Sequence, residues 1–372
     1  MTSYNLLVNK LEVPVASFLR CFALVMLASL WCRAAAADPI ADFYRGKVIN
    51  LVIGYSAGGG FDLYARAVGR HLGRHIPGNP AIVPHNMPGA GSVQAALFMA
   101  GAAPQDGTAI ATVAQSMALQ QAMGDPSIRF DMRRFNWIGN PIQGVSTIAT
   151  WRASGVHSIA DAKRRDVSIG ATGINVTMQY PQVLNSLIGT RFKVVIGYPG
   201  GNDIALAMER GEVDGQGQLS WASLKSGHPS WLRDGKVDLL VQIGLAKLPD
   251  ISAYMGHDVP LMTELATSEE DRRILELISS GEVIGRPLFT TPGVPAERVA
   301  ALRAAFDATM QDPAFLADAA RQSLDVDPLD GARLQQVVER IVTTPAATVA
   351  KLVQAIEGRD VVRNVSGGKK AE

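Results

Sequence analysis

The sequence has almost no cysteine and no excess of charge, and both absences exclude certain kinds of protein. Only two of its 372 residues are cysteine, Cys21 and Cys32, and both lie in an N-terminal segment that we expect to be removed. The mature chain would then have no thiol, no disulfide and no cysteine metal ligand, so its stability must come from a hydrophobic core.

Charge of either sign is balanced along the chain. Lys and Arg number 35, and Asp and Glu number 34. Without residues 1–37, which contain Lys10, Arg20, Arg33 and Glu12, the chain keeps 32 basic and 33 acidic residues. Such a near-neutral chain gives no indication of nucleic acid or an anionic membrane as a partner.

Complete sequence patterns of metal and catalytic sites are also missing. His71 and His75 have the i, i+4 spacing of a zinc-binding helix, but the Glu of H-E-x-x-H is absent and no third ligand is suggested. The pattern G-x-S-x-G occurs once, at Gly54-Tyr55-Ser56-Ala57-Gly58, but the histidines are scattered without the spacing of catalytic partners. We therefore expect no metal, no cofactor and no enzymatic activity, while carboxylates that folding alone brings together remain an open alternative for acid–base chemistry.

The N-terminus has the pattern of a secretory signal peptide. Lys10 and Arg20 precede the apolar segment 21–31, and the small residues 34–37 follow. This apolar segment is shorter than the ~20 residues that a membrane span needs. We expect residues 1–37 to be cleaved near Ala37 and the mature protein to be exported.

The remaining ~335 residues exceed what one core usually holds, which predicts two domains. Strand-like apolar runs alternate with helical patterns, and this alternation is typical of α/β proteins with mostly parallel sheets. The expected strands are 48–53, 81–83, 108–113, 167–171, 193–197 and 239–244, and the expected helices are 62–72, 92–102, 178–188 and 204–210.

The most informative segment is the apolar run 50–55 that ends at Gly58, Gly59 and Gly60 before a helix begins. Glycines there expose backbone N–H groups, and the helix points its positive end at the same place, which predicts an anion site. The spacing fits neither G-x-x-x-x-G-K-[ST] nor G-x-G-x-x-G, so nucleotide binding is disfavoured. A glycine-rich turn that binds nothing is the alternative, and Asp62 is expected to have a structural role in the first helical turn.

Three later segments repeat this arrangement of glycines and small polar residues before a helix: 85–92, 170–177 and 197–203. In open α/β sheets, ligands bind in the crevice at the carboxyl ends of strands. Several such loops, contributed by two domains, predict a cleft.

Six motifs in a fixed order carry a family resemblance: Ala57–Asp62 with Ala65-Arg66, Asn86–Gly91, Pro104–Thr108, Tyr198–Gly201, Met208–Asp214 and Thr291–Pro295. In this order they resemble, nearly end to end, the receptors of tripartite tricarboxylate transporters, also called the Bug family of periplasmic solute-binding proteins.

This resemblance implies a type II periplasmic-binding fold of two α/β lobes, with the ligand enclosed between them. Lobe 1 would comprise residues 38–140 and 286–372, and lobe 2 residues 141–285. The resemblance also implies a periplasmic monomer that captures a small organic acid, a carboxylate, and delivers it to integral membrane subunits of a transporter.

In such receptors the carboxylate lies between the first glycine loop and a loop of lobe 2, which here are 55–61 and 172–177. The chain departs from the family at Tyr55-Ser56, where many members have Phe-Pro or Tyr-Pro, and at 174–177, where they often have Gly-Ser and a nearby His.

Asp203 either contacts ligand or caps its helix, and Gln115 and Ser116 either face the cleft or belong to a solvated loop. The candidate ligand-binding residues are Tyr55, Ser56, Gly58, Gly59, Gly60, Phe61, Gln115, Ser116, Gly173, Ile174, Asn175, Val176, Thr177, Tyr198 and Asp203.

Two other functions remain open from the sequence. One is an exported α/β enzyme acting on a small carboxylate or phosphate ester, which would need an activated nucleophile or a metal, and the patterns reveal no complete set of residues for either. The other is a binding protein that presents its ligand to a membrane sensor instead of a transporter.

Overall fold

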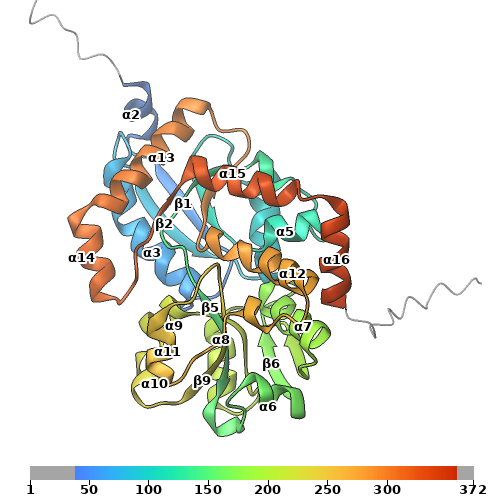
Figure 1. Ribbon diagram of the computed structural model, residues 1–372. Helices are drawn as coiled ribbons and strands as arrows, with labels where there is room; N and C mark the ends of the chain where they lie inside the picture. Colours follow the sequence, from blue (N-terminus) through green and yellow to red (C-terminus); the bar gives the residue numbers. More distant parts are fainter. Residues whose placement is uncertain (1–37, 358–372) are drawn as a thin grey trace, which may run out of the picture.

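The computed structural model describes residues 38–357, and the predicted signal peptide and its cleavage site lie outside them. The chain forms two lobes, each built on one β-sheet, with the lobe of the second sheet below the first in Figure 1. No helix among residues 38–357 has the length and apolar character that a membrane crossing requires.

The first sheet has six strands and the second has five. In spatial order the first contains β11 (Leu329–Asp330), β4 (Asn136–Asn140), β10 (Leu288–Thr290), β3 (Ala109–Thr112), β1 (Val48–Ile53) and β2 (Ala81–Asn86). The second contains β7 (Phe192–Ile196), β6 (Val167–Ala171), β8 (Gly215–Ser220), β5 (Ser146–Trp151) and β9 (Val237–Ile243).

Helices surround both sheets. In the first lobe they are α2 (Pro39–Tyr44), α3 (Gly60–Leu72), α4 (Val93–Leu97), α5 (Met117–Ala122), α13 (Ala296–Gln311), α14 (Pro313–Arg321) and α15 (Gly331–Val342). In the second they are α6 (Ile159–Arg164), α7 (Val176–Ile188), α8 (Gly201–Glu209), α9 (Trp221–Gly227), α10 (Pro229–Arg233), α11 (Pro249–Met255) and α12 (Glu269–Ser279). Short helical turns are η1 (Gly73–His75), η2 (Ala90–Ser92), η3 (Phe98–Ala102), η4 (Met132–Arg134), η5 (Arg152–Ser154), η6 (Met262–Leu265) and η7 (Ser280–Ile284). The C-terminal helix α16 (Ala346–Glu357) packs on α7 and α12.

The α/β prediction is confirmed, and the expected strands 48–53 and 167–171 agree with β1 and β6 to the residue. The sheets are mixed rather than mostly parallel. Strands joined by helical crossovers pair in parallel, as β1 does with β2 and β3. Strands reached from the segments that cross between the lobes enter in the opposite direction, so β10 and β5 pair antiparallel with their neighbours.

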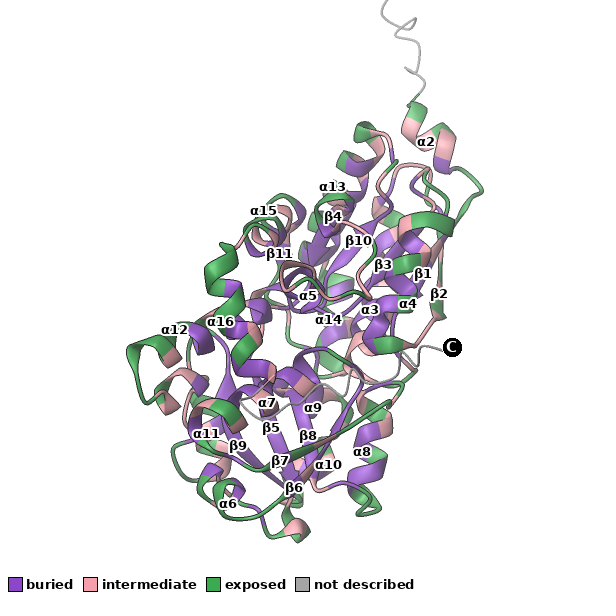
Figure 2. Ribbon diagram, turned by 90° about the vertical axis from the view of Figure 1, so that its right-hand side faces the viewer, coloured by how far each residue is buried: buried purple, intermediate pink, exposed green. Residues whose placement is uncertain are grey.

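Burial follows the sheets. Figure 2 shows the central strands of both lobes mainly buried, while the edge strands β2 and β7 are largely exposed or intermediate and the helices expose their outer faces. One core cluster contains residues of both lobes, among them Trp137 and Phe289 of the first and Tyr180 of the second. The lobes therefore share apolar contacts as well as two crossing segments.

Packing of α7 on its sheet depends on Gly217 in β8. A Cβ atom at this position would lie 1.9 Å from the carbonyl oxygen of Thr177 and 2.8 Å from the ring of Pro181. Pro181 lacks the N–H that would bond to this Thr177 oxygen within the helix. The glycine lets the strand approach this turn closely, and so fixes the start of α7.

The two segments that cross between the lobes are joined by the carboxamide of Asn140. Its Oδ1 accepts from the backbone N–H of Arg286 at 2.8 Å and of Ile142 at 3.2 Å, and its Nδ2 donates to Val283 O at 3.2 Å. Gly285 has φ +57°, and a Cβ there would lie 1.9 Å from Ile142 O, so only glycine fits. The lobe boundaries at 140/141 and 285/286 stay a prediction, which the membership of β4, β5 and β10 in their sheets supports.

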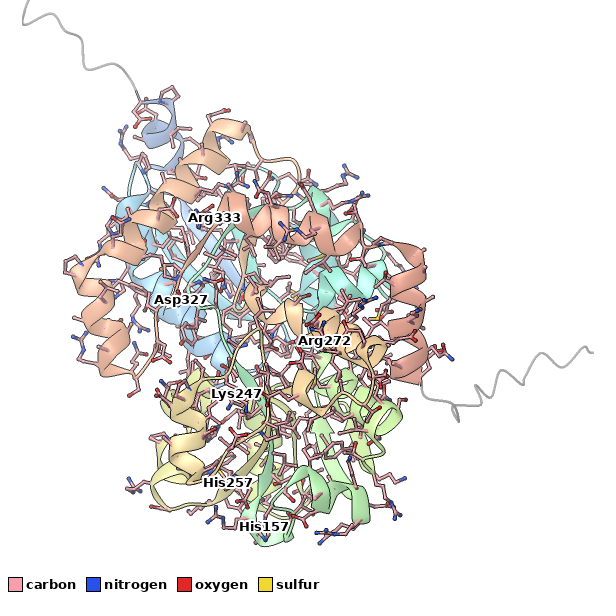
Figure 3. The ribbon with its side chains drawn as sticks, in the orientation of Figure 1. His157, Lys247, His257, Arg272, Asp327 and Arg333 are labelled. Atoms are coloured by element: carbon pink, nitrogen blue, oxygen red, sulfur yellow. The ribbon has the colours of Figure 1, made fainter. Side chains whose placement is uncertain are left out.

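Many charged side chains lie on the outer surface of both lobes (Figure 3). Lys247 pairs with Asp258 at 3.0 Å and Glu264 at 2.8 Å, and Arg272 pairs with Glu269 at 2.6 Å. These exposed pairs contribute little stability individually, because water and salt screen them.

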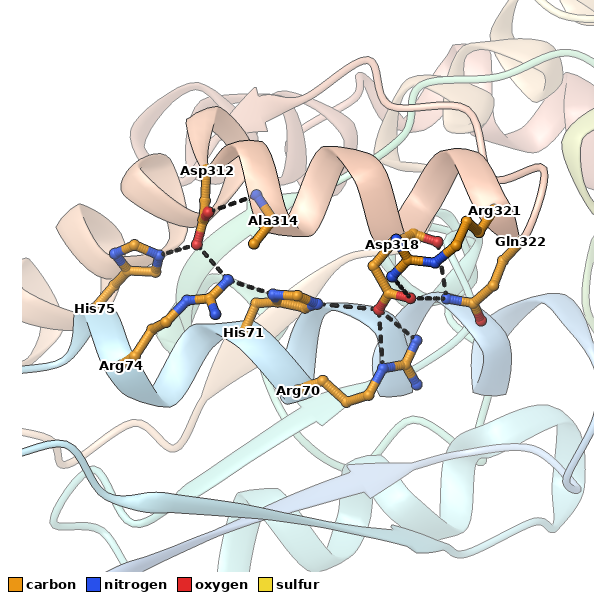
Figure 4. Close-up of polar contacts among 9 residues, drawn as sticks. All are labelled: Arg70, His71, Arg74, His75, Asp312, Ala314, Asp318, Arg321 and Gln322. Atoms are coloured by element: carbon orange, nitrogen blue, oxygen red, sulfur yellow. Dashed lines mark hydrogen bonds and ion pairs between the residues drawn. The ribbon is translucent and has the colours of Figure 1, made fainter.

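Ion pairs join α3 and the following turn η1 to α14 and its N-cap Asp312, and His71 and His75 both take part in them (Figure 4). His71 Nε2 lies 3.0 Å and Arg70 Nε 3.0 Å from Asp318 Oδ2, and His75 Nε2 lies 2.8 Å from Asp312 Oδ2. The hydrogen bond from His71, aided by Arg70, lowers the pKa of Asp318 to about 2, against an opposing effect of burial.

We predict that Asp318→Asn destabilises the protein at neutral pH by about 1 kcal/mol, since Arg70 is half exposed and solvent screens its charge. A carboxyl whose pKa is lowered by folding stabilises above its ordinary pKa and loses this contribution as the pH falls towards 2. Urea unfolding at pH 7, 4 and 3 should therefore show the deficit shrinking in acid. Asp42→Asn, in an exposed pair on α2, is the control. An equal deficit at all three pH values would contradict the prediction.

Candidate functional site

Loops from the two lobes that the sequence places at the site lie in direct contact. Ser56 Oγ, in the loop after β1, donates to Asp203 Oδ2 in the first turn of α8 at 2.5 Å. The side chain of Gln120 in α5 donates to the carbonyl oxygen of Ile174 in the loop after β6. The loop after β1 thus contacts the first turn of α8, which follows β7, and the loop after β6 contacts α5, which follows β3.

Glycines permit this contact, because Gly60, Gly200 and Gly173 face the opposite lobe with no room for a side chain. A Cβ at Gly60 would lie 2.0 Å from Ser223 Oγ, and one at Gly200 would lie 2.3 Å from Ser56 Oγ. A Cβ at Gly173 would lie 2.9 Å from the backbone nitrogen of Gly91. The glycines expected to expose N–H groups therefore also allow the lobes to meet.

In the first glycine loop, the Asp62 carboxylate bonds to an amide expected to face an anion. Gly58 N donates to Asp62 Oδ2 at 3.0 Å, and Asp62 Oδ1 accepts from Arg66 Nε and Asn86 Nδ2, both at 2.8 Å. These contacts match the structural role expected of Asp62. Gly59 lies more openly, since a Cβ there would be 3.8 Å from Asn202 N.

The loop after β6 uses its polar side chains internally. Asn175 caps α7 by accepting from Thr177 N at 3.0 Å, accepts from Thr177 Oγ1 at 2.6 Å, and donates to Thr172 Oγ1 at 2.9 Å. Val176 is buried in the core. Of the five candidates in this loop, Gly173 and Ile174 line a pocket, while Asn175, Val176 and Thr177 shape the loop.

That pocket has a volume of about 410 Å³ and lies between loops of the two lobes. It includes the predicted Gly173, Ile174 and Tyr198. Burial raises the pKa of the Tyr198 hydroxyl. Its lining residues are Pro88, Gly89, Ala90, Val93, Ser127, Thr172, Gly173, Ile174, Ile196, Gly197, Tyr198 and Pro199, and none of these is charged.

Glu282, in the second crossing segment, is a buried carboxylate at the junction of the lobes. Its Oε1 accepts from Gln115 Nε2 at 2.9 Å and from the Tyr180 hydroxyl at 2.7 Å, and its Oε2 accepts from Ser146 Oγ at 2.7 Å. Burial raises the pKa of Glu282, and these hydrogen bonds oppose that effect. The predicted site residue Gln115 therefore binds Glu282, while Ser116 is buried and its Oγ finds no acceptor or donor among residues 38–357.

Arg286 is a second buried charge from the same segment. Its Nη2 donates to Ser223 Oγ at 2.8 Å, and its guanidinium lies 4.3 Å above the Phe61 ring, which stacks on Tyr55 at 4.5 Å. Burial lowers the pKa of Arg286. Burial also raises the pKa of the Tyr55 hydroxyl to about 12, although Ser92, Arg286 and Thr172 oppose the rise. Within the described residues, Arg286 Nε has no acceptor.

The sequence did not predict either buried charge, although it predicted that the chain crosses back to the first lobe near residues 285 and 286. No motif contains Glu282 or Arg286. The sequence offered one signal for them: Glu282 and Arg286 lie four residues apart and flank the uncharged run Val283-Ile284-Gly285. Their partners Gln115 and Ser223 are distant in sequence and become visible only in the fold.

The histidines do not converge on these loops. His157 and His257 lie in the lower lobe of Figure 3, and His157 Nδ1 is 2.8 Å from Asp238 Oδ2. No three His, Asp or Glu side chains in the described part of the chain are arranged to hold a metal ion.

Comparison with known proteins places this architecture. No protein-family model matches the chain. A curated relative, the UPF0065 protein in gbd 5'region of Cupriavidus necator, is 42% identical over 87 residues, which are 23% of this chain and 26% of that relative. The chain thus matches only about a quarter of the relative's length.

Solved structures match over most of the chain. The periplasmic binding protein BugD superimposes with a TM-score of 0.66 at 18% identity, covering 84% of this chain and 98% of BugD. This is the two-lobed fold of the Bug and TctC binding proteins. A TctC solute-binding protein from Polaromonas gives 0.52 at 21% identity, covering 84% and 99%. MatC from Rhodopseudomonas palustris with bound malate gives 0.64 at 18%, covering 82% and 99%. These structural neighbours confirm the fold that the motif resemblance implies.

We predict that Glu282→Gln makes stability less dependent on pH. A carboxyl whose pKa is raised by folding stabilises fully below its unfolded pKa, near 4.5, and this contribution is lost as the pH rises through the folded value. The variant keeps the Oε1 acceptor but has no charge to bury. Its unfolding free energy, relative to wild type, should therefore increase between pH 4.5 and 8, by about 1.4 kcal/mol per pKa unit of the rise.

Denaturant unfolding at pH 4.5, 6 and 8 measures this difference. Glu276→Gln on α12, half exposed in an ion pair with Arg272, is the surface control. Parallel pH curves for wild type and Glu282→Gln would contradict the prediction.

Proposed function

We propose that this chain is an exported solute-binding receptor of the Bug type, which captures a small organic acid between its two lobes. The observation that carries the proposal is the contact of the glycine loop 55–61 with the first turn of α8, where Ser56 meets Asp203. Loops at the carboxyl ends of strands from both lobes converge there, as in ligand clefts of α/β proteins. The neighbour MatC was solved with bound malate, a carboxylate.

The mechanism is differential binding to two arrangements of the lobes. A ligand that contacts both lobes favours the closed arrangement over the open one by as much as its affinities for them differ. Residues 38–140 and 286–372 would move as lobe 1 and residues 141–285 as lobe 2, about the segments that Asn140 joins. No covalent step is needed.

Periplasmic location, action as a monomer and delivery to integral membrane subunits of a tripartite transporter complete the proposal. The signal-peptide pattern of residues 1–37 and the periplasmic neighbours support it. The function requires no cofactor, because capture and release consist of noncovalent contacts and lobe motion.

We predict that a carboxylate will raise the melting temperature of the purified protein. A thermal-shift screen should include malate, adipate, citrate, benzoate and phosphate esters. A ligand at ~100 times its dissociation constant adds roughly 2.7 kcal/mol of stability. Stabilisation by one class of acid, with the acid recovered unchanged, supports the receptor. Silence across all carboxylates, or conversion of a phosphate ester, would contradict it.

We predict that Gly60→Ala hinders closure while Gly59→Ala does not. An alanine Cβ at position 60 would lie 2.0 Å from Ser223 Oγ in the other lobe, whereas at position 59 the nearest atom is 3.8 Å away. Small-angle scattering should show a larger radius of gyration for Gly60→Ala only, and its affinity for the acid found in the screen should fall at least tenfold.

Adding Ser223→Gly to Gly60→Ala removes the two Ser223 atoms at 2.0 and 3.0 Å and leaves the flexible end of Arg286 at 2.9 Å, so both measurements should recover at least in part. Urea unfolding monitors folding separately, because Gly60 lies at the first position of α3 and alanine suits a helix. A compact Gly60→Ala with unchanged affinity would contradict closure at this contact.

A further inference from the structure

The walls of the interlobe pocket carry no charged side chain, which is unusual for a site that binds a polyanion. The only side-chain hydroxyls of its lining are those of Ser127, Thr172 and Tyr198. Its volume of about 410 Å³ lies in the range of small-molecule sites. The apolar side chains that line it are Pro88, Ala90, Val93, Ile174, Ile196 and Pro199.

The buried charges of the interlobe region do not contribute to this pocket. Glu282 already binds donors from both lobes, and Arg286 is directed to Ser223 and Phe61. Neither belongs to the pocket lining. A ligand with several carboxylates would therefore have to lose water from each of them without a cation in contact, which is unfavourable.

The pocket can satisfy one carboxylate. Gly173 and Ile174 both line it, and within the described chain their backbone N–H groups donate to no protein acceptor. They immediately precede Asn175, the N-cap of the thirteen-residue helix α7. The positive end of that helix favours a single negative charge at this edge of the pocket.

Two isoleucines of the lining present apolar surface that a ligand could cover. Ile174 and Ile196 are each 55% exposed, although both are large apolar side chains. An apolar body in the pocket would remove part of this surface from water, and the gain is proportional to the area covered. One end of the pocket thus suits a carboxylate and its walls suit hydrocarbon.

We infer that the ligand is a monocarboxylic acid with an apolar or aromatic body, rather than a di- or tricarboxylate. This inference rests on the proposed function and specifies its substrate class. The carboxylate lies at Gly173 and Ile174, and the body contacts Ile196, Val93 and Tyr198.

Isothermal titration calorimetry of the purified protein with benzoate, phenylacetate, malate and citrate tests the inference. Benzoate or phenylacetate should bind at least tenfold more tightly than malate and citrate. Ile196→Asp places a negative charge on the exposed rim and should weaken binding of the aromatic acid at least tenfold, while Ile196→Val should stay within threefold of wild type. Leu245→Asp is the matched control, since Leu245 is 66% exposed in the same lobe and outside the pocket.

The outcomes separate this inference from the proposed function. Tighter binding of malate or citrate would overturn the substrate class and leave the receptor intact. Binding of no carboxylate would overturn both. Equal effects of Ile196→Asp and Leu245→Asp on binding would place the acid elsewhere and overturn the pocket assignment.

Discussion

The buried carboxylate of Glu282 is the constraint on which the relation of the two lobes depends. A carboxylate without water costs several kcal/mol unless donors replace its hydration. Here the donors come from both sides: Gln115 follows a strand of the first sheet, whereas Ser146 and Tyr180 belong to the second lobe. Opening the lobes would therefore break at least one of these bonds unless Glu282 lies close to the axis of the motion. The pairing of Asn140 with both crossing segments limits that motion.

Glycine has two functions at this junction, and they compete for the same loops. Its missing Cβ exposes amides, which suits an anion, and also lets backbones of opposite lobes approach within contact distance. At Gly60 and Gly200 the close approach is evident, because Ser223 and Ser56 occupy the space of a side chain. At Gly58 the amide bonds to Asp62. The first glycine loop is therefore an interlobe contact that also keeps free amides, because the N–H groups of Gly59 and Gly60, like those of Gly173 and Ile174, donate to no acceptor among the described residues.

The sequence predicted local features well, because local rules determine them. The β-branched run 48–53 became β1 to the residue, and Asn175 caps the helix that the pattern after Gly173 required. Glu282 and Arg286 could not be predicted, since a buried charge is recognised by its partners and these are contributed by distant parts of the chain. The antiparallel β5 and β10 were missed for a related reason: their direction follows from where the chain crosses between lobes, not from their own residues.

Direct contacts between the lobes also determine how ligand affinity relates to closure. Ser56 with Asp203, Arg286 with Ser223 and Lys225 with Asp325 all join the lobes through protein atoms. These contacts already stabilise the closed arrangement in part. A ligand has to supply only the remaining free-energy difference between the open and closed arrangements. Stronger contacts between the lobes would increase the fraction of molecules in the binding-competent arrangement. The apparent affinity for ligand would then rise until it equals the intrinsic affinity of that arrangement. Stronger contacts would also slow release of ligand, so the proposed receptor would need contacts of intermediate strength, such as those that short polar side chains make at glycine loops.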